Sequence, residues 1–135
     1  MILPANTHVA VVDSQHFLLM RNKGTATEPR LESDGTPDVS MSNKNAGMRH
    51  MDDRGKKEGK ENLDKAAHAA GVVEWLNKAV LDRRIDKLVV VADPDTLGEM
   101  RRQYSQHLQA ALLGELDRQL VKLPGPDLVR AIEAV

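Results

Sequence analysis

The sequence contains no cysteine, few aromatic residues and no long apolar segment, and each absence excludes a class of structure or chemistry. Without cysteine, the chain forms no disulfide, no thiolate nucleophile and no cysteine-based zinc or iron–sulfur site. Aromatic residues make up 2% of the chain, so we expect an aliphatic core and no base-stacking surface for nucleic acid. No window approaches the roughly 20 apolar residues that a membrane helix needs, so we expect no membrane insertion.

An excess of positive charge is also lacking. The 135 residues include 19 Lys and Arg and 20 Asp and Glu, for a net charge of −1. A chain with this balance has no strong general attraction to DNA or to anionic lipid, so we expect no DNA partner. The first residues, MILPANTH, show neither the basic region nor the apolar run of a signal peptide, and we therefore expect a cytoplasmic protein.

The strongest architectural signal lies in residues 85–104. Residues 88–92 form an unbroken apolar run, which is typical of a strand that is buried on both faces. Asp93 is suited to cap a helix, and Pro94 suits the first helical position. Apolar residues then recur at helical spacing. The sequence therefore predicts a central strand that leads directly into a helix.

The preceding segments predict a hairpin, an edge strand and a long helix. Apolar runs over 7–13 and 16–22 are separated by two polar residues, as in an antiparallel hairpin. Residues 30–33 are bracketed by proline and glycine, which favours a short edge strand. An apolar stripe over 62–83 predicts a long helix that is capped by Asn62.

Two segments lack a clear pattern. Residues 40–61 are rich in Ser, Asn, Gly and charge without periodicity, which predicts a mobile loop. Residues 105–121 have leucines four residues apart, as in a helix, but several of these leucines also alternate with polar residues, as in an edge strand. A short helix from Asp127 ends the chain.

Several strings in this order carry a resemblance to a known family: THVAVVDSQHFLLMRNKG, the helix from Asn62, IDKLVVVADPDTLGEMRR and LLGELDRQLVKLPGPDLVRAI. They resemble the bacterial family of proteins required for attachment to host cells, whose members resemble the central domain of archaeal and eukaryotic release factors and of Pelota. The resemblance covers nearly the whole chain. It implies a single α/β (α+β-like) domain with a mixed β-sheet of about five strands and three helices, and it places a strand in 111–121.

The resemblance also raises a question of catalysis. In release factors this domain carries a Gly-Gly-Gln loop, which enters the peptidyl-transferase centre and promotes hydrolysis of peptidyl-tRNA. The resemblance places the corresponding loop within 40–61, where the chain has Ala46-Gly47-Met48 and no glutamine. We therefore predict no catalytic residue.

The expected function is that of a non-enzymatic bacterial protein linked to host attachment, which acts through a protein or ribosomal RNA partner. One alternative is a ribosome-associated, peptidyl-tRNA hydrolase-like or release-factor-like enzyme that lacks Gly-Gly-Gln. Another is a homodimer that assembles through a sheet edge, because an unpaired edge strand invites pairing.

Six basic residues are candidates for binding RNA or a partner: Arg49, Arg54, Lys56, Lys57, Arg101 and Arg102. Together they would form a patch for RNA phosphates. The alternative is a solvated helix face on which Arg101 pairs with Glu99 or Asp95, since surface charge commonly serves solubility alone.

Metal binding is the other chemistry to consider. Asp93 and Asp95 follow a buried strand, where α/β proteins bind ligands, and paired carboxylates there could hold magnesium. Helix capping by Asp93 accounts for the same pattern more simply. The five histidines show no ligand spacing. We therefore predict no metal and no cofactor.

Overall fold

The computed structural model describes residues 1–39 and 57–135, and of residues 57–62 it describes the backbone alone. These ranges form a five-stranded sheet in the order β3-β2-β1-β4-β5. The strands are β1 (His8–Val12), β2 (Phe17–Asn22), β3 (Leu31–Ser33), β4 (Leu88–Ala92) and β5 (Leu112–Leu116). The described helices are α2 (Lys57–Leu81), α3 (Pro94–Arg101), α4 (Gln106–Ala111) and α5 (Gly125–Glu133).

The sheet is mixed, and its two central strands are fully buried. β1 pairs antiparallel with β2, and β2 with β3, whereas β1–β4 and β4–β5 are parallel. Every residue of β1 and of β4 is buried. A strand that is covered on both faces has no polar side to present, which explains the unbroken apolar run in β4. The predicted hairpin, central strand and mixed sheet are confirmed.

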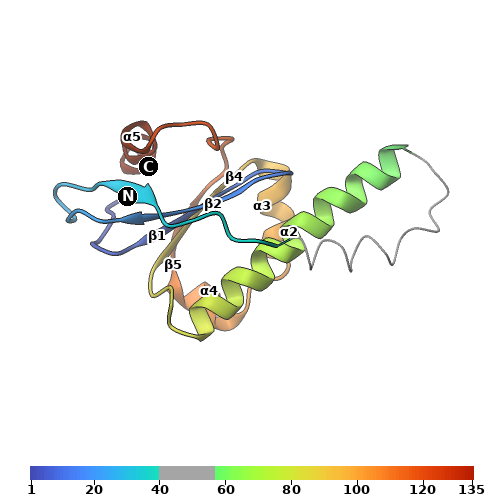
Figure 1. The fold of residues 1–135 in the computed structure, drawn as a ribbon, viewed down its shortest axis with the longest axis horizontal. Helices are drawn as coiled ribbons and strands as arrows, with labels where there is room; N and C mark the ends of the chain where they lie inside the picture. Colours follow the sequence, from blue (N-terminus) through green and yellow to red (C-terminus); the bar gives the residue numbers. More distant parts are fainter. Residues whose placement is uncertain (40–56) are drawn as a thin grey trace.

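Helices cover both faces of the sheet (Figure 1). Helices α2, α3 and α4 pack on one face, where Leu76 of α2 joins Val90 of β4 in the larger core cluster. Helix α5 packs on the other face, where Ile132 joins Val91 in the second cluster. Successive residues of a strand point to opposite faces, so Val90 and Val91 supply different cores.

The long helix begins earlier than the sequence pattern predicted. It starts at Lys57, so Asn62 lies inside the helix and does not cap it. The apolar stripe does not reach these first turns, but opposite charges lie four residues apart, as in Lys57 with Glu61 and Lys60 with Asp64. Such spacing stabilises a helix without apolar contacts.

This early start also corrects the predicted loop. Residues 57–61 belong to α2 and are not a loop. The remainder of the predicted mobile loop, 40–56, lies outside the described residues.

Helix α2 ends in a left-handed turn at Arg83, whose φ is 63°. The Arg84 N–H donates to the Ala79 carbonyl at 2.9 Å, and the Arg83 N–H donates to the Val80 carbonyl at 3.1 Å. This pair of bonds is the Schellman arrangement, which satisfies carbonyls that the end of a helix leaves unpaired. The predicted end of the long helix near residue 83 is confirmed within two residues, and these two backbone bonds close the helix.

The ambiguous segment contains both a helix and a strand. Helix α4 ends at Ala111, and β5 follows without a loop but ends at Leu116. The described residues therefore contain four helices, where three were predicted, and the strand predicted over 111–121 is shorter. Gly114 fits in β5 because the Met1 side chain packs against it, where an added Cβ would lie 2.3 Å from Met1 Cε.

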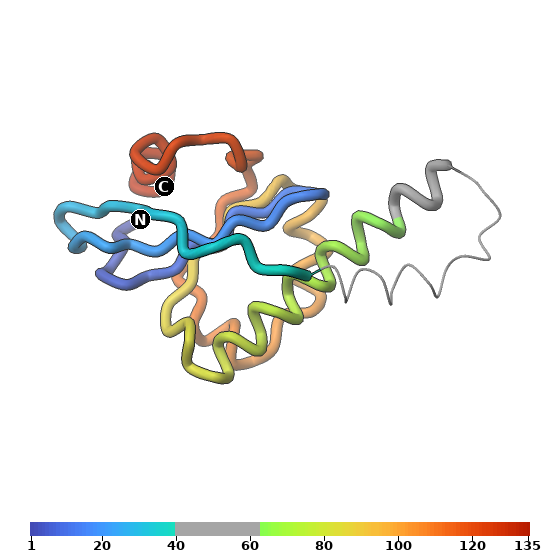
Figure 2. Tube along the Cα trace, in the orientation of Figure 1, coloured from blue at the N-terminus to red at the C-terminus, as the bar shows by residue number. Residues whose placement is uncertain are grey.

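The first and last described residues lie together beside α5 (Figure 2). The Met1 amino group donates to the carbonyls of Ile132 at 3.3 Å and Glu133 at 3.2 Å. Within the described ranges, no helix is both long enough and apolar enough to cross a membrane.

Candidate functional site

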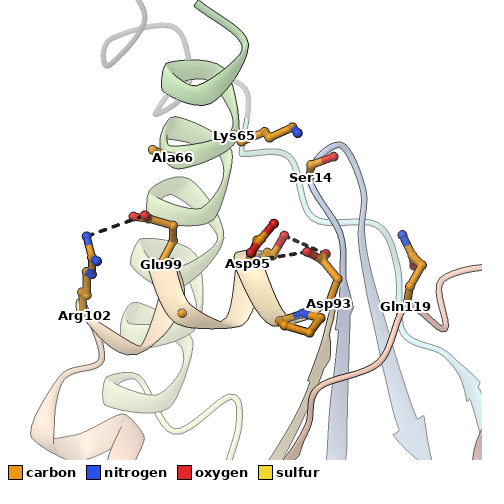
Figure 3. Close-up of a pocket in the computed structure, with 11 residues that line it drawn as sticks. Ser14, Lys65, Ala66, Asp93, Asp95, Glu99, Arg102 and Gln119 are labelled. Atoms are coloured by element: carbon orange, nitrogen blue, oxygen red, sulfur yellow. Dashed lines mark hydrogen bonds and ion pairs between the residues drawn. The ribbon is translucent and has the colours of Figure 1, made fainter. Parts of the chain in front are cut away.

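A polar cleft of about 740 Å³ lies at the carboxyl ends of β1 and β4, between the β1–β2 turn, α2 and α3 (Figure 3). Parallel strands of α/β sheets commonly bind ligands at this edge. The cleft is lined by Ser14, Lys65, Ala66, Asp93, Pro94, Asp95, Thr96, Gly98, Glu99, Arg102 and Gln119. Its size falls in the range of small-molecule sites.

The floor of the cleft is the start of α3. Asp93 is the N-cap of this helix, and its carboxylate accepts from the Thr96 N–H at 3.1 Å and from the Thr96 hydroxyl at 2.7 Å. The predicted cap is confirmed, and Pro94 occupies the first helical position. Both Asp93 oxygens are engaged by Thr96, which leaves Asp95 as the exposed carboxylate of this turn.

The described part of the chain contains no group of three or more His, Asp or Glu side chains that could hold a metal ion. Magnesium in proteins is held by one or two carboxylates together with waters, and here both oxygens of Asp93 already bond to Thr96 at the start of the helix.

The walls of the cleft bring opposite charges together. Lys65 reaches from α2 toward Ser14 at the tip of the β1–β2 turn (Figure 3). On the far wall, Arg102 lies 3.6 Å from Glu99, and both side chains are exposed. Such an exposed pair contributes little to stability, so Arg102 is free to exchange its partner for a ligand.

The first residue of the β1–β2 turn, Asp13, carries a buried carboxylate. Asp13 is 8% exposed, and its Oδ1 accepts from the N–H groups of Gln15 at 2.8 Å and His16 at 2.6 Å. Its oxygens also lie 2.9 Å from Nδ1 of the His16 ring, and Gln119 Nε2 donates to Oδ2 at 3.1 Å. Asp13 thus joins the turn to a wall of the cleft.

Hydrogen bonding has a larger combined effect than burial on the pKa of Asp13. Burial by itself raises the pKa of this carboxyl, but the bonds from Gln15, His16 and Gln119 together hold the pKa below its ordinary value. Asp13 is therefore ionised at neutral pH.

Asp93 and Asp95 were predicted at this edge, and Arg102 was predicted only as a basic candidate for binding RNA or a partner. Asp13, Lys65 and Gln119 were not predicted. An aspartate that immediately follows a strand is a common turn residue, and this signal could have found Asp13. No local pattern indicates Gln119, because 106 positions separate it from Asp13.

The six predicted basic residues do not form a single described patch. Arg49, Arg54 and Lys56 lie outside the described residues, and Lys57 is described only as the first backbone position of α2. Arg102 lines the cleft. Lys65, which was not predicted, lines it as well and lies on α2 eight residues after Lys57, about 12 Å along the axis.

Arg101 does not line the cleft, and it pairs with Glu115 of β5. Its Nε donates to Glu115 Oε1 at 3.1 Å, and the Tyr104 hydroxyl donates to Oε2 of the same carboxylate at 2.8 Å. The hydrogen bond to Glu115 raises the pKa of Arg101. The predicted alternative partners, Glu99 and Asp95, are wrong: β5 supplies the partner across the sheet edge.

Comparison with known proteins identifies the family. The family model for bacterial archaeo-eukaryotic release factor family 12 matches residues 6–132, which is nearly the whole chain. A search of curated proteins finds no match. The release-factor part of the expected resemblance is confirmed, and the link to host attachment remains a prediction. The matched range contains the whole sheet and the four described helices up to Ile132 in α5, and the chain therefore belongs to bacterial archaeo-eukaryotic release factor family 12.

Proposed function

We propose that this domain acts at the ribosome, where it binds ribosomal RNA through Arg54, Lys56 and Lys57, which precede or begin α2 in the sequence. The family match over residues 6–132 is the observation that carries the proposal. Release factors work on ribosome-bound substrates, and a chain that matches their family along nearly its whole length is expected to share that location.

The arrangement of the fold supports this assignment. Helix α2 runs out beyond the sheet at its N-terminal end, so the backbone of its first turns lies away from both cores (Figure 1). Arg54, Lys56 and Lys57 follow closely in the sequence at this end. Positive side chains on a projecting element can reach phosphates of a large RNA, even when the net charge of the protein is −1.

The proposed role does not require catalysis by a release-factor loop. The segment 40–61 contains no glutamine, so the residue that promotes hydrolysis in release factors is lacking there. We propose a cytoplasmic location because ribosomes are there. A role in host attachment would follow indirectly from an effect on translation.

Removing the basic residues at the start of α2 should weaken binding to ribosomes. We expect the triple variant Arg54→Ala, Lys56→Ala, Lys57→Ala to bind at least about 10-fold more weakly than the parent, because phosphate contacts supply most of the affinity of such complexes. Co-sedimentation with purified ribosomes at low salt measures the effect.

A matched control removes three positive charges from the opposite end of the domain. Lys23, Lys78 and Lys87 are all exposed and lie after β2, in the last turn of α2 and before β4. Their replacement by alanine should leave binding within about twofold of the parent. Equal losses in both triple variants would show a general charge effect and contradict the proposed site.

A further inference from the structure

The polar cleft at the carboxyl ends of β1 and β4 is not used by the proposed role at the ribosome. From β1 the chain leads to β2 on one side of the sheet, whereas from β4 it leads to β5 on the other side. Where neighbouring parallel strands lead in opposite directions, α/β proteins bind ligands in the crevice between them. The cleft of about 740 Å³ lies at this position in the fold.

Small residues keep the cleft open between α2 and α3. Ala66 lines it from α2, and Gly98 lines it from α3. A Cβ added at Gly98 would have no neighbour within 4 Å, so open space rather than packed side chains lies beside this position. A small ligand therefore has room between the two helices.

Three of the five charged side chains in the lining already have partners. The Asp93 carboxylate accepts from the N–H and from the hydroxyl of Thr96, and the positive end of α3 balances its charge. Glu99 and Arg102 lie 3.6 Å apart, so their charges offset each other. These three groups leave little free charge for a ligand.

The other two charged side chains, Lys65 and Asp95, have opposite charges and no partner. Both are exposed, and within residues 1–39 and 57–135 neither side chain forms a hydrogen bond or an ion pair. Lys65 projects from α2 and Asp95 lies in the first turn of α3, so the two charges come from different sides of the cleft (Figure 3). Since they are not paired with each other, a ligand can lie between them.

The signs of these charges select the class of ligand. A phosphate at the start of α3 would meet the Asp95 carboxylate, and Asp93 already occupies the helix end that would attract an anion. A polyamine would meet the positive charges of Lys65 and Arg102. A ligand with one charge of each sign matches the two unpaired side chains.

We propose that the cleft binds a small zwitterion of the amino-acid class, whose ammonium group pairs with Asp95 and whose carboxylate pairs with Lys65. Both contacts are charge-assisted hydrogen bonds, which are stronger than bonds between neutral groups. The hydroxyl of Ser14, toward which Lys65 reaches, is available to the same carboxylate (Figure 3). This inference goes beyond the proposed binding of ribosomal RNA and does not depend on it.

Titration with matched compounds of equal carbon number tests the proposal without ribosomes. The isomers 2-aminobutyrate and 4-aminobutyrate carry both charges at a short and at a longer separation, whereas butylamine and butyrate each carry one charge. We expect the full chain to bind at least one isomer with a dissociation constant of about 1 mM or below, and both singly charged compounds at least about 10-fold more weakly. Amide chemical-shift changes in nuclear magnetic resonance measure the binding.

Two variants and two matched controls locate the site. Asp95→Asn and Lys65→Gln should each weaken binding of the better isomer about 10-fold, because each removes one charge-assisted bond. The controls Asp86→Asn and Lys87→Gln change exposed residues just before β4, at the opposite end of that strand from the cleft. They should leave the dissociation constant within about twofold of the parent value.

A further variant fills the cleft without changing its charge. Gly98→Leu should abolish measurable binding while far-ultraviolet circular dichroism shows a folded domain, because the added side chain enters open space and leucine favours a helix more than glycine does. The proposal would be overturned if neither isomer bound, if butylamine or butyrate bound equally well, or if Asp95→Asn and Lys65→Gln both kept the parent affinity. Retained binding by a folded Gly98→Leu protein would contradict it as well. Loss of ribosome binding alone would not affect it.

Discussion

Replacing Asn22 by leucine is expected to lower the free energy of unfolding by about 3–5 kcal/mol, because it leaves four buried or part-buried backbone groups without their partner. Asn22 is the last residue of β2 and is 0% exposed. Its Oδ1 accepts from the N–H groups of Gly24 and Arg30, each at 2.9 Å. Its Nδ2 donates to the carbonyls of Leu3 at 3.0 Å and Thr25 at 3.2 Å.

This side chain joins the segment before β1 to the connection between β2 and β3. Leucine matches the size of asparagine but offers no donor or acceptor. Each buried group left without a partner costs about 1–3 kcal/mol, and the bond to Leu3 is buried while those to Gly24, Thr25 and Arg30 are part-buried. Urea unfolding followed by circular dichroism measures the loss.

Replacement of an exposed amide side chain by leucine provides the control for Asn22→Leu. Gln109 is exposed on α4, so Gln109→Leu should change the free energy of unfolding by less than about 0.5 kcal/mol. A loss below about 1 kcal/mol for Asn22→Leu would mean that water or a rearranged loop replaces its bonds.

Aspartate at either Val90 or Val91 should prevent folding. Both side chains are 0% exposed, and they point into different cores on opposite faces of the sheet. A buried carboxylate without a partner costs at least about 5 kcal/mol, which reaches the whole stability of a typical domain. We expect both variants to show an unfolded amide spectrum by nuclear magnetic resonance.

The edge strand provides the comparison for these two variants. Leu113 of β5 is 42% exposed, so a carboxylate there keeps its contact with water. Leu113→Asp should therefore fold, with a loss of about 1 kcal/mol or less. A folded Val91→Asp protein would show that α5 does not form a closed second layer over the sheet.

Local patterns predicted the elements that local physics determines. The apolar run of β4, the hairpin of β1 and β2, and the cap at Asp93 all rest on neighbouring residues. The start of α2 was missed because an apolar stripe was the criterion, whereas the first turns carry opposite charges spaced four residues apart, a sequence pattern that favours a helix.

The candidate site was harder to predict because its contacts join distant positions. Asp13 meets Gln119 only when β1 and the segment after β5 reach the same edge of the sheet. Arg101 meets Glu115 for a similar reason, across the step from α3 to β5. The sequence supplies the side chains, but the order of strands decides which of them become neighbours.

The resemblance predicted the fold more closely than it predicted the site. It correctly indicated a release-factor type of domain with a five-stranded mixed sheet, and it favoured a strand where β5 lies. The basic residues were chosen by charge alone, and Arg101 shows the weakness of that criterion: its guanidinium is held by Glu115.

Salt-dependent binding of the unmodified protein to ribosomal subunits is the most direct test of the proposed function. The protein should co-sediment with purified large subunits at low salt. If it neutralises about three phosphates, its affinity should fall about 10-fold or more between about 50 mM and about 200 mM salt. The same fall should be absent in the variant that lacks Arg54, Lys56 and Lys57. Failure of the unmodified protein to co-sediment with either subunit at low salt would contradict a role at the ribosome.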